Sequence, residues 1–375
     1  MVKIFICGDI VNYNHLDGLV CSDHLASIIS NADYSICNFE APIEGYGEPI
    51  PKIGIHHFQR KSTISGLKKQ GFNLICLANN HIMDFGSEGL LGTIEEAKKA
   101  EIDVLGAGRN FSEAYKPLVK VIDNLKFGFI NACEAQFGVL DYFSNDEQPG
   151  YAWINHHKID QQIIELKKKC DYVIVISHAG LEHYNIPQKE WRNRYRHFCN
   201  LGADVVVGSH PHVPQGYEKY NSSYIFYSLG NFYFDSKNYI NKEDRSFSLI
   251  LYFEKDKQIH FEPVYHHKQD GIVQISPKEK QIDLKSLNSK LGKEYKKYHD
   301  EMTLEIFNKK VKRNLIYSLT PIPYDGKFIS SLKKMARLLY RRKKVDKNLL
   351  LLHLLRNESY YYVARHAMEL ILLEK

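Results

Sequence analysis

Short apolar runs rich in Val and Ile recur along the first 270 residues, and stretches with helical spacing separate many of them. Short continuous runs are typical of strands buried on both faces. The predicted strands cover residues 2–7, 34–39, 74–78, 126–131, 172–177, 205–208, 224–229 and 247–254. The predicted helices cover 24–30, 63–69, 88–100, 158–169 and 188–201, with Gly71, Gly106 and Gly202 at helix ends. This alternation predicts an α/β fold, in which the later strands form an antiparallel or mixed second sheet.

The pattern changes near residue 270, where Lys-rich sequence with helical spacing replaces the strands. Helices are predicted over 284–311, 328–342 and 348–372, with a proline-containing break at 320–323. Residues 271–375 carry 23 Lys and Arg against 11 Asp and Glu, whereas residues 1–270 carry 27 against 33. The net charge of +6 therefore conceals two parts. We predict a domain over 1–268 and a basic helical region over 269–375.

The composition excludes several classes of protein. Of the 375 residues, 44% are hydrophobic and 25% charged, as in folded globular proteins. No run approaches the roughly 18 apolar residues of a membrane-spanning helix, and the first apolar run is too short for a signal peptide. We therefore expect a cytoplasmic protein. Seven cysteines without a C-x-x-C pair predict reduced core thiols rather than disulfides or a cysteine-rich zinc site.

Polar side chains able to bind metals stand directly after five of the predicted strands. They are Asp9; Asn38 and Glu40; Asn79, Asn80, His81 and Asp84; His178 and Glu182; and His210 and His212. Ligands of α/β proteins bind at the carboxyl ends of strands, so these side chains are expected to converge. A single Asp or Asn after a strand more often serves a turn. Their joint arrangement is what indicates a site.

Carboxylate, amide and imidazole ligands favour Mn, Fe or Zn, and no cysteine accompanies them to favour a softer metal. A carboxylate such as Glu40 can bridge two cations, which can hold a phosphoryl group and activate water. His210 and His212, in a Gly-Ser-His-Pro-His turn, can serve different ions. His81 follows a candidate Asn ligand and can act as a general acid near neutral pH. The pattern therefore predicts one or two divalent ions.

The order of these segments resembles that of a known family. The chain contains Gly-Asp-Ile, Asn-Phe-Glu, Leu-Ala-Asn-Asn-His-Ile-Met-Asp-Phe-Gly, His-Ala-Gly-Leu-Glu-His, Gly-Ser-His-Pro-His-Val and Tyr-Ser-Leu-Gly-Asn-Phe. This series, within residues 1–264, resembles the CapA family of bacterial capsule and poly-γ-glutamate synthesis proteins, in the calcineurin-like metallophosphoesterase superfamily. The resemblance implies a four-layer sandwich of two mixed sheets flanked by helices. A C-terminal helical region would follow it.

The resemblance also implies roles for single residues. Those that match metal ligands are Asp9, Glu40, Asn80, His178, His210 and His212. His81 matches the catalytic histidine, and Asp84 is expected to orient it. Residues expected to line the substrate site are Asn38, Asn79, Glu182 and Asn231. The superfamily begins with Asp-x-His, whereas Ile10 and Val11 follow Asp9 here, so one of two ions would lack a histidine.

Two functions remain open at this point. The first is a metal-dependent phosphoesterase-like hydrolase in cell-surface polymer synthesis, acting on a phosphorylated or anionic polymer or glycan. The second is a non-catalytic, metal-binding accessory protein of the capsule-synthesis machinery. The basic C-terminal region, with its cluster at 341–344, fits a solvated helical face or peripheral contact with an anionic membrane. No recognition motif accompanies the charge, which argues against nucleic acid.

Other histidines and one arginine have ordinary interpretations. The pair His56-His57 lies in a loop from which it can reach substrate, but solvation of that loop is the favoured interpretation. The pairs at 156–157 and 266–267 are predicted to lie between elements as structural or surface residues. Arg109 fits either contact with an anionic substrate or a salt bridge within its loop.

Overall fold

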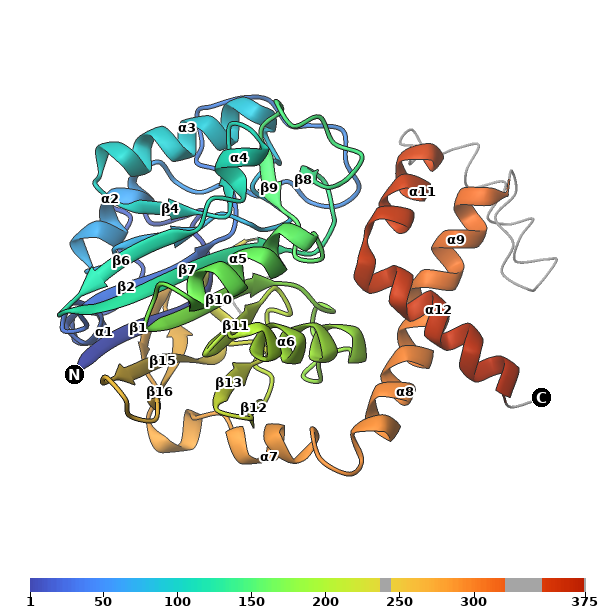
Figure 1. Ribbon diagram of the computed structural model, residues 1–375. Coiled ribbons are helices and arrows are strands. Elements are labelled where there is room, and N and C mark those ends of the chain that lie inside the picture. Colours follow the sequence, from blue (N-terminus) through green and yellow to red (C-terminus); the bar gives the residue numbers. More distant parts are fainter. Residues whose placement is uncertain (237–243, 321–345, 374–375) are drawn as a thin grey trace. The chain divides into compact units, whose positions relative to one another are not determined.

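The structure, a computed structural model, describes residues 1–236, 244–320 and 346–373 (Figure 1). It divides into two compact units. The first contains Met1–Ile50 and His56–Lys293, and we call it the sandwich unit. The second contains Pro51–Ile55 and Glu294–Lys375, and we call it the helical unit.

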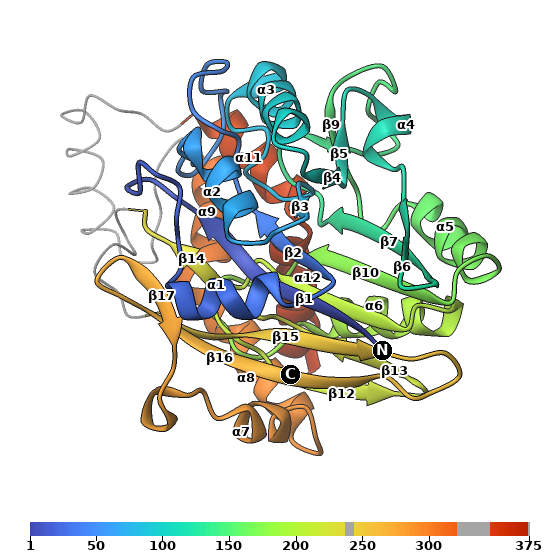
Figure 2. The ribbon, with the colours of Figure 1, turned by 90° about the vertical axis from the view of Figure 1, so that its left-hand side faces the viewer.

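The first sheet of the sandwich unit has eight strands in the order β17–β16–β15–β1–β2–β3–β4, with β14 paired to β1 off this path (Figure 2). The strands are β1 (Val2–Val11), β2 (Tyr34–Phe39), β3 (Leu74–Cys76), β4 (Asp103–Leu105), β14 (Asn231–Phe234), β15 (Arg245–Phe253), β16 (His260–Gln269) and β17 (Ile272–Ile275). Strands β1 to β4 run parallel, and β15 to β17 add an antiparallel half. The first sheet is therefore mixed.

The second sheet has six strands in the order β12–β13–β11–β10–β7–β6. They are β6 (Leu118–Ile122), β7 (Leu125–Cys133), β10 (Tyr172–His178), β11 (Val205–Ser209), β12 (Tyr217–Tyr220) and β13 (Ser223–Phe226). The four inner strands are parallel and the two edge strands antiparallel. A small third sheet contains β5 (Ala107–Gly108), β8 (Val139–Leu140) and β9 (Gly150–Ala152).

Strand β1 illustrates why the central strands read as continuous apolar runs. Ile4 and Ile6 belong to one buried cluster with Phe129 of β7, whereas Phe5 belongs to another with Leu25 of helix α1 (Asp23–Ser30). Alternate side chains of a strand point to opposite faces. One face of the first sheet therefore packs on the second sheet and the other on helices, so both faces demand apolar side chains.

Helices cover the outer faces of both sheets. They are α1 (Asp23–Ser30), α2 (Ser62–Lys69), α3 (Gly86–Lys99), α4 (Phe111–Ala114), α5 (His157–Lys167) and α6 (Lys189–Leu201). Helix α1 contacts β17 and α3 contacts β4, while α5 and α6 lie side by side over β7, β10, β11 and β13 (Figure 1). The order helices, sheet, sheet, helices is the predicted four-layer sandwich.

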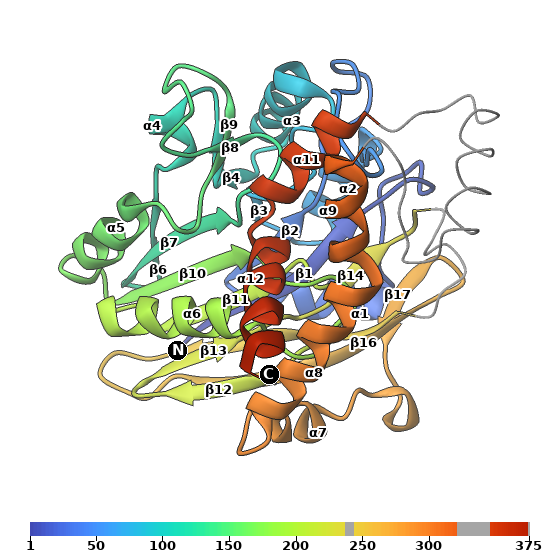
Figure 3. The ribbon, with the colours of Figure 1, turned by 90° about the vertical axis from the view of Figure 1, so that its right-hand side faces the viewer.

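The described residues of the helical unit form two pairs of packed helices. Its elements are α8 (Tyr295–Ile306), the π-helical turn η2 (Phe307–Val311), α9 (Lys312–Leu319), α11 (Lys347–Arg356) and α12 (Glu358–Leu373). Helix α9 packs against α11, and α8 packs against α12 (Figure 3). Asn357 separates α11 from α12, and its side-chain oxygen accepts the backbone N–H of Tyr360 at 2.8 Å.

Several details differ from the sequence prediction. Gly106 does not end a helix; it links β4 to β5 with a φ of 91°. The pair His266-His267 lies inside β16 and is buried. The prediction placed it between elements because no apolar run marks this strand in the sequence. The predicted helix 348–372 is two helices. The predicted helix 328–342 and the basic cluster 341–344 lie outside the described residues.

The sandwich unit continues past the boundary predicted at 268. Strand β17 pairs with β16, and a short 3-10 turn (Lys278–Lys280) and α7 (Leu284–Ser289) follow it. Asn288 then accepts the backbone N–H of Tyr217 in β12 at 2.8 Å. The compact units divide only after Lys293, so the predicted helix 284–311 spans this division. The change in charge at 270 precedes the structural boundary.

Candidate metal centre

The polar residues predicted at strand ends do converge. Asp9 lies near the end of β1, Asn38 near the end of β2, and His178 at the end of β10. The turns after β2, β3 and β11 supply the others, except Asn231, which begins β14. Side chains less than 10% exposed in this cluster are Asp9, Asn38, Glu40, Asn79, Asn80, His81, Asp84, His178, His210, His212 and Asn231. Such a concentration of buried polar groups requires compensating partners.

An irregularity in β1 positions Asp9. The register against β2 shifts between Ile6 and Asp9, and the register against β14 shifts directly after Asp9. A Cβ atom at Gly8 would lie 1.8 Å from the carbonyl oxygen of Gly230, so the close approach of these backbones requires glycine. The Asp9 carboxylate accepts Nδ2 of Asn38 at 2.7 Å. Bulges of this kind commonly direct a side chain into a site.

Glu40 is the most exceptional residue of the cluster. Its side chain is fully buried, and neither carboxylate oxygen accepts a hydrogen bond within the described residues. Its Oε1 lies 3.6 Å from Nε2 of His178 and 3.8 Å from Nε2 of His212. Burial, together with the charge of Asp9, raises the pKa of the Glu40 carboxyl well above its ordinary value. A buried carboxylate without donors is costly, and a cation would compensate it.

Two groups of ligand atoms share Glu40. One consists of Glu40, His178 and His210, and the other of Asp9, Glu40 and His212. Within each group the ligand atoms lie no more than 4.8 Å apart. A carboxylate common to two such groups can bridge two ions, and oxygen with imidazole ligands fits Mn, Fe or Zn. The residues therefore fit one or two divalent cations.

The two imidazoles on one side of Glu40 are neutral. Nδ1 of His210 lies 3.0 Å from Nε2 of His178, and Oδ1 of Asn80 lies 2.9 Å from the same nitrogen. Burial lowers the pKa of His178 well below its ordinary value and that of His210 to about 4. Neutral imidazole provides the lone pair that a metal needs. Ser209 Oγ lies 3.1 Å from Nδ1 of His178 and helps to orient the ring.

His212 differs from this pair in its charge. Burial acts to lower its pKa, but the carboxylates of Glu40 and Asp9 outweigh burial and raise the pKa to about 10. Its Nδ1 lies 3.5 Å from Oδ2 of Asp9 and 3.0 Å from Oδ1 of Asn231. The His212 imidazolium is thus the counterion of two acids when no metal is bound. A bound metal ion would displace that proton.

The turn that carries both histidines has strained backbone. The φ angle is 95° at His210 and 59° at His212, on either side of Pro211. These left-handed conformations cost a non-glycine residue on the order of 1–2 kcal/mol each. Here they bring His210 to His178 and His212 to Asp9. Strain of this kind is often retained where function requires a particular side-chain direction.

His81 and Asp84 form a separate pair beside the two groups. Nδ1 of His81 lies 2.7 Å from Oδ2 of Asp84. An ionised carboxylate can only accept, so Nδ1 carries the proton and Nε2 is the nitrogen that can exchange a proton with a substrate. The same Oδ2 accepts the backbone N–H of His57 at 2.7 Å. The geometry expected for these two residues is therefore present.

The solvated loop predicted for His56-His57 is wrong for His57. This residue is 7% exposed, and its ring lies edge-on to that of His81 with 4.3 Å between centroids. The hydroxyl of Tyr13 lies 2.5 Å from Nδ1 of His57. Distant segments bury the loop, and its own sequence carries no periodicity that would have indicated this. Arg109 forms its predicted loop salt bridge, with Glu113 at 2.6 Å.

The four residues predicted to line the substrate site have different surroundings. Asn38 has a buried Oδ1 without a hydrogen-bond partner in the described chain, as expected of an atom that binds a ligand. Asn79 instead braces the turn, because Nδ2 donates to the carbonyl of Phe39 and Oδ1 accepts the N–H of His81. Asn231 contacts His212. Glu182 is half-buried, and its charge acts on Glu40, His210 and His212.

Sequence reasoning missed Glu134, which is fully buried directly after β7. Its Oε1 lies 3.7 Å from Nε2 of His210 and accepts Nε2 of Gln136 at 2.7 Å. The backbone N–H of Gly180 lies 3.3 Å from its Oε2. The predicted strand stopped at Asn131, three residues short of it. Extending that strand to Cys133 would have placed an acid at a sixth strand end.

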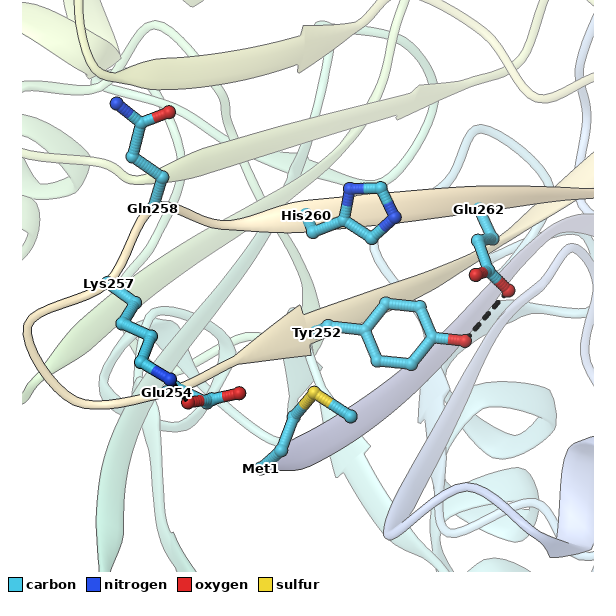
Figure 4. Close-up of a pocket in the computed structure, with 7 residues that line it drawn as sticks. All are labelled: Met1, Tyr252, Glu254, Lys257, Gln258, His260 and Glu262. Atoms are coloured by element: carbon cyan, nitrogen blue, oxygen red, sulfur yellow. Dashed lines mark hydrogen bonds and ion pairs between the residues drawn. The ribbon is translucent and has the colours of Figure 1, made fainter.

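A surface pocket of about 230 Å³ lies elsewhere on the sandwich unit (Figure 4). It is lined by Met1, Tyr252, Glu254, Lys257, Gln258, His260 and Glu262. Met1 precedes the start of β1, whereas Asp9 lies near the other end of that strand. The hydroxyl of Tyr252 donates to Glu262 at 2.8 Å. The pocket is therefore separate from the buried cluster.

All seven cysteines are buried and free, which confirms the prediction of reduced core thiols. Among the described helices, none is long and apolar enough to cross a membrane.

The fold and the buried cluster define an α/β sandwich protein with a candidate centre for divalent ions. Its sequence matches the family described as "Bacterial capsule synthesis protein PGA_cap" over residues 3–236. The chain belongs to this family.

Two relatives from Bacillus carry related names. The "Capsule biosynthesis protein CapA" of Bacillus anthracis is 32% identical over 244 residues, which cover 61% of this chain and 58% of that protein. The "PGA biosynthesis protein CapA" of Bacillus subtilis (strain 168) is 34% identical over 219 residues, which cover 56% of each. The chain thus matches less than two thirds of the length of these relatives.

Solved structures resemble the fold at low sequence identity. The "calcineurin-like phosphoesterase YfkN from Bacillus subtilis" is 13% identical with a TM-score of 0.39, over 80% of this chain and 98% of that one. A hypothetical protein from Thermus thermophilus is 16% identical with a TM-score of 0.45, over 72% of this chain and 100% of that one. This likeness concerns the fold alone.

Proposed function

We propose that the protein is a metal-dependent, phosphoesterase-like hydrolase that acts in the synthesis of a cell-surface polymer. Glu40 carries the proposal, because its buried oxygens have no hydrogen-bond donor in the described residues and lie between two groups of ligand atoms. Two adjoining cations are the arrangement that clamps a phosphoryl group for in-line attack. The names of the Bacillus relatives support capsule or poly-γ-glutamate as the polymer.

The chain supplies six residues for holding one or two ions. They are Asp9, Glu40, Asn80, His178, His210 and His212. A bound Mn, Fe or Zn ion would supply positive charge for a phosphoryl oxygen and would make water more acidic. The low pKa values of His178 and His210 leave both imidazoles ready to bind without first losing a proton.

Proton transfer in this proposal belongs to His81. Its Nε2 would give a proton to the departing oxygen of the substrate, while Asp84 holds Nδ1 and makes the ring more basic. The N–H of His57 fixes the Asp84 carboxylate in turn. The unpartnered Oδ1 of Asn38 would face the substrate or the ions. Glu182, half-buried beside these groups, would lie at the entrance.

Metal analysis and an esterase panel test the proposal together. Purified protein with Mn²⁺ would be assayed on phosphomonoesters and phosphodiesters, beside His81→Ala, His210→Ala and the control His24→Ala. His24 is exposed in α1 and serves as the matched histidine. We expect His210→Ala to lose metal, His81→Ala to keep metal but lose turnover, and the control to keep both. Turnover that is absent, or equal in all four proteins, would refute the hydrolase.

A non-catalytic accessory protein is the second candidate. Its support is the missing histidine after Asp9, where Ile10 and Val11 are buried apolar residues. Polymer production in cells separates the two ideas. The hydrolase requires that His81→Ala abolish production, whereas an accessory role predicts normal production with His81→Ala and loss only with a metal-free His210→Ala/His212→Ala protein.

We further propose a phosphorylated or anionic polymer or glycan as substrate and the polymer-synthesis machinery as partner. The basic C-terminal region would allow peripheral contact with an anionic membrane, and sedimentation with phosphatidylserine vesicles at low salt tests that contact. Nucleic acid is not part of the proposal. The cytoplasmic location expected from the sequence stays a prediction that cell fractionation tests.

A further inference from the structure

The helical unit contains its own cluster of metal-binding side chains. His299 and Asp300 are neighbours in α8, and His366 comes from α12. One ligand atom from each lies within 4.8 Å of the other two. His299 is 3% exposed, and the side chains of Asp300 and His366 are 19% and 16% exposed. Three such groups from two packed helices are unusual in an otherwise Lys-rich region.

Both imidazoles converge on one carboxylate oxygen. Oδ1 of Asp300 lies 2.8 Å from Nε2 of His366 and 3.7 Å from Nδ1 of His299. The two rings lie 4.9 Å apart between centroids. Tetrahedral zinc with bonds of about 2.0–2.1 Å requires ligand atoms about 3.3 Å apart. The two separations from Oδ1 of Asp300 lie on either side of that value, and all three ligand atoms lie within 4.8 Å of one another.

The surroundings of the cluster also suit a cation. Lys296 contacts the other Asp300 oxygen, Oδ2, at 2.6 Å, which leaves Oδ1 directed at the imidazoles. The Lys296 side chain is 82% exposed and can turn into solvent when a cation arrives. Behind His366, Oε2 of Glu369 lies 3.8 Å from Nδ1. This separation is longer than a hydrogen bond, and Oε1 of Glu369 accepts Nε of Arg365 at 3.2 Å, so Glu369 adds negative charge near the cluster without fixing the ring.

We propose that His299, Asp300 and His366 form a Zn²⁺ site that joins α8 to α12. Two imidazoles and one carboxylate are a common ligand set for zinc, with water as the fourth ligand. The site lies wholly within the helical unit and is independent of the proposed hydrolase. Its consequence is structural, because Zn²⁺ would replace the hydrogen bond between His366 and Asp300 with metal–ligand bonds that join the two helices.

Zinc binding by the full-length chain tests the site. Protein stripped with a chelator would be titrated with Zn²⁺ in a His210→Ala/His212→Ala background, which weakens binding in the sandwich unit. The variants are His366→Gln, Asp300→Asn and the control His353→Gln, a half-buried histidine in α11. Loss of an outer partner alone weakens metal binding roughly 10- to 100-fold. We therefore expect Asp300→Asn and His366→Gln to lose one zinc equivalent, with affinity at least about 100-fold lower.

Asp300→Asn separates the proposal from a plain hydrogen bond between helices. Its amide oxygen can still accept from His366, so the fold should persist while the anionic ligand is gone. We expect Zn²⁺ to raise the unfolding temperature of the parent and of His353→Gln, but not of Asp300→Asn. With Co²⁺, tetrahedral absorption bands should appear in the same two proteins alone. Equal zinc content and affinity in the parent, Asp300→Asn and His366→Gln would overturn the site.

Discussion

Two glutamates of the sandwich unit occupy opposite electrostatic situations. Glu218 of β12 meets Nη2 of Arg192 at 2.8 Å, Nε of Arg196 at 2.7 Å and the hydroxyl of Tyr227. Burial acts to raise its pKa, but these hydrogen bonds, led by Arg196, lower the pKa to about 2. Glu40 is more deeply buried, has no hydrogen-bond donor in the described chain, and has a raised pKa.

The contrast indicates what each carboxylate is for. Where the charge of a buried acid has a structural role, this chain provides the cations itself, in the form of two arginines. Around Glu40 it provides imidazoles, another acid and amide oxygens, all of which are metal ligands. The His212 imidazolium offsets part of the Glu40 charge from 3.8 Å but donates no hydrogen bond to it, and an ion from outside would complete the compensation. The predictions below test this difference.

The largest effect is expected from Glu40→Gln. The amide cannot bridge two ions, so metal content should fall and turnover should drop by about 1000-fold, the upper range for loss of a key electrostatic group. The metal-free variant should unfold at the same or a higher temperature than the metal-free parent, because a neutral side chain is less costly to bury. Metal analysis and calorimetry measure both results. Unchanged metal content would contradict the bridging role.

The next effect concerns proton transfer rather than charge compensation. His81→Ala should lower kcat by about 100-fold, within the range for loss of a general acid, with metal content unchanged. Asp84→Asn should lower kcat by about 10-fold, because the ring loses its orientation but remains. In His81→Ala, the part of the pH–rate profile that reflects the protonation of His81 should disappear. If His81→Ala also lost its metal, the separation between this pair and the Glu40 cluster would be wrong.

Glu218→Gln should leave catalysis intact and weaken the fold. Two arginines would lose a charged acceptor, which costs about 2–3 kcal/mol in the free energy of unfolding. Urea denaturation followed by fluorescence measures this. Metal content and turnover should match those of the parent. A variant as stable as the parent would show that solvent reaches these arginines and replaces the carboxylate.

The smallest effect is the pH dependence of the difference in unfolding free energy between the parent and Glu218→Gln. Because folding lowers the pKa of Glu218 from an ordinary 4.5 to about 2, its contribution is complete above pH 4.5 and is lost as the pH falls through about 2. The stability gap between the parent and Glu218→Gln should therefore narrow between about pH 5 and pH 2. The change cannot exceed about 1.4 kcal/mol per pH unit for one group. A constant gap would contradict the assignment.

Much of the fold could be predicted from the sequence because its central strands are buried on both faces. The predicted strands 34–39 and 172–177 are mainly apolar and match β2 and β10 closely. Strand β6, whose residues alternate between exposed and half-buried, and β16, which contains no apolar run, were not predicted. The terminal helices were predicted as one because Asn357, the single residue between α11 and α12, does not interrupt the helical spacing of the sequence.

The candidate site was predictable to the extent that its residues follow predicted strands. His210 and His212 follow β11 directly, and their turn is distinctive. Glu134 was missed because its strand was ended too early, and His57 because its burial depends on contacts with Tyr13 and His81 from distant segments. The sequence does not reveal that the pKa of His210 is lowered and that of His212 raised, because only Pro211 separates the two residues and the shifts come from their surroundings in the fold.

The irregular register of β1 has a consequence for how this family can change in length. Because side chains alternate along a strand, a single inserted or deleted residue between Ile6 and Asp9 would turn the carboxylate toward the opposite face of the sheet. Gly8 leaves no room for an alternative path beside Gly230. The loop around Phe143, which is 96% exposed, has no such constraint. In aligned sequences of relatives, insertions and deletions should therefore fall in that loop, while the number of residues from the start of β1 to Asp9 stays constant.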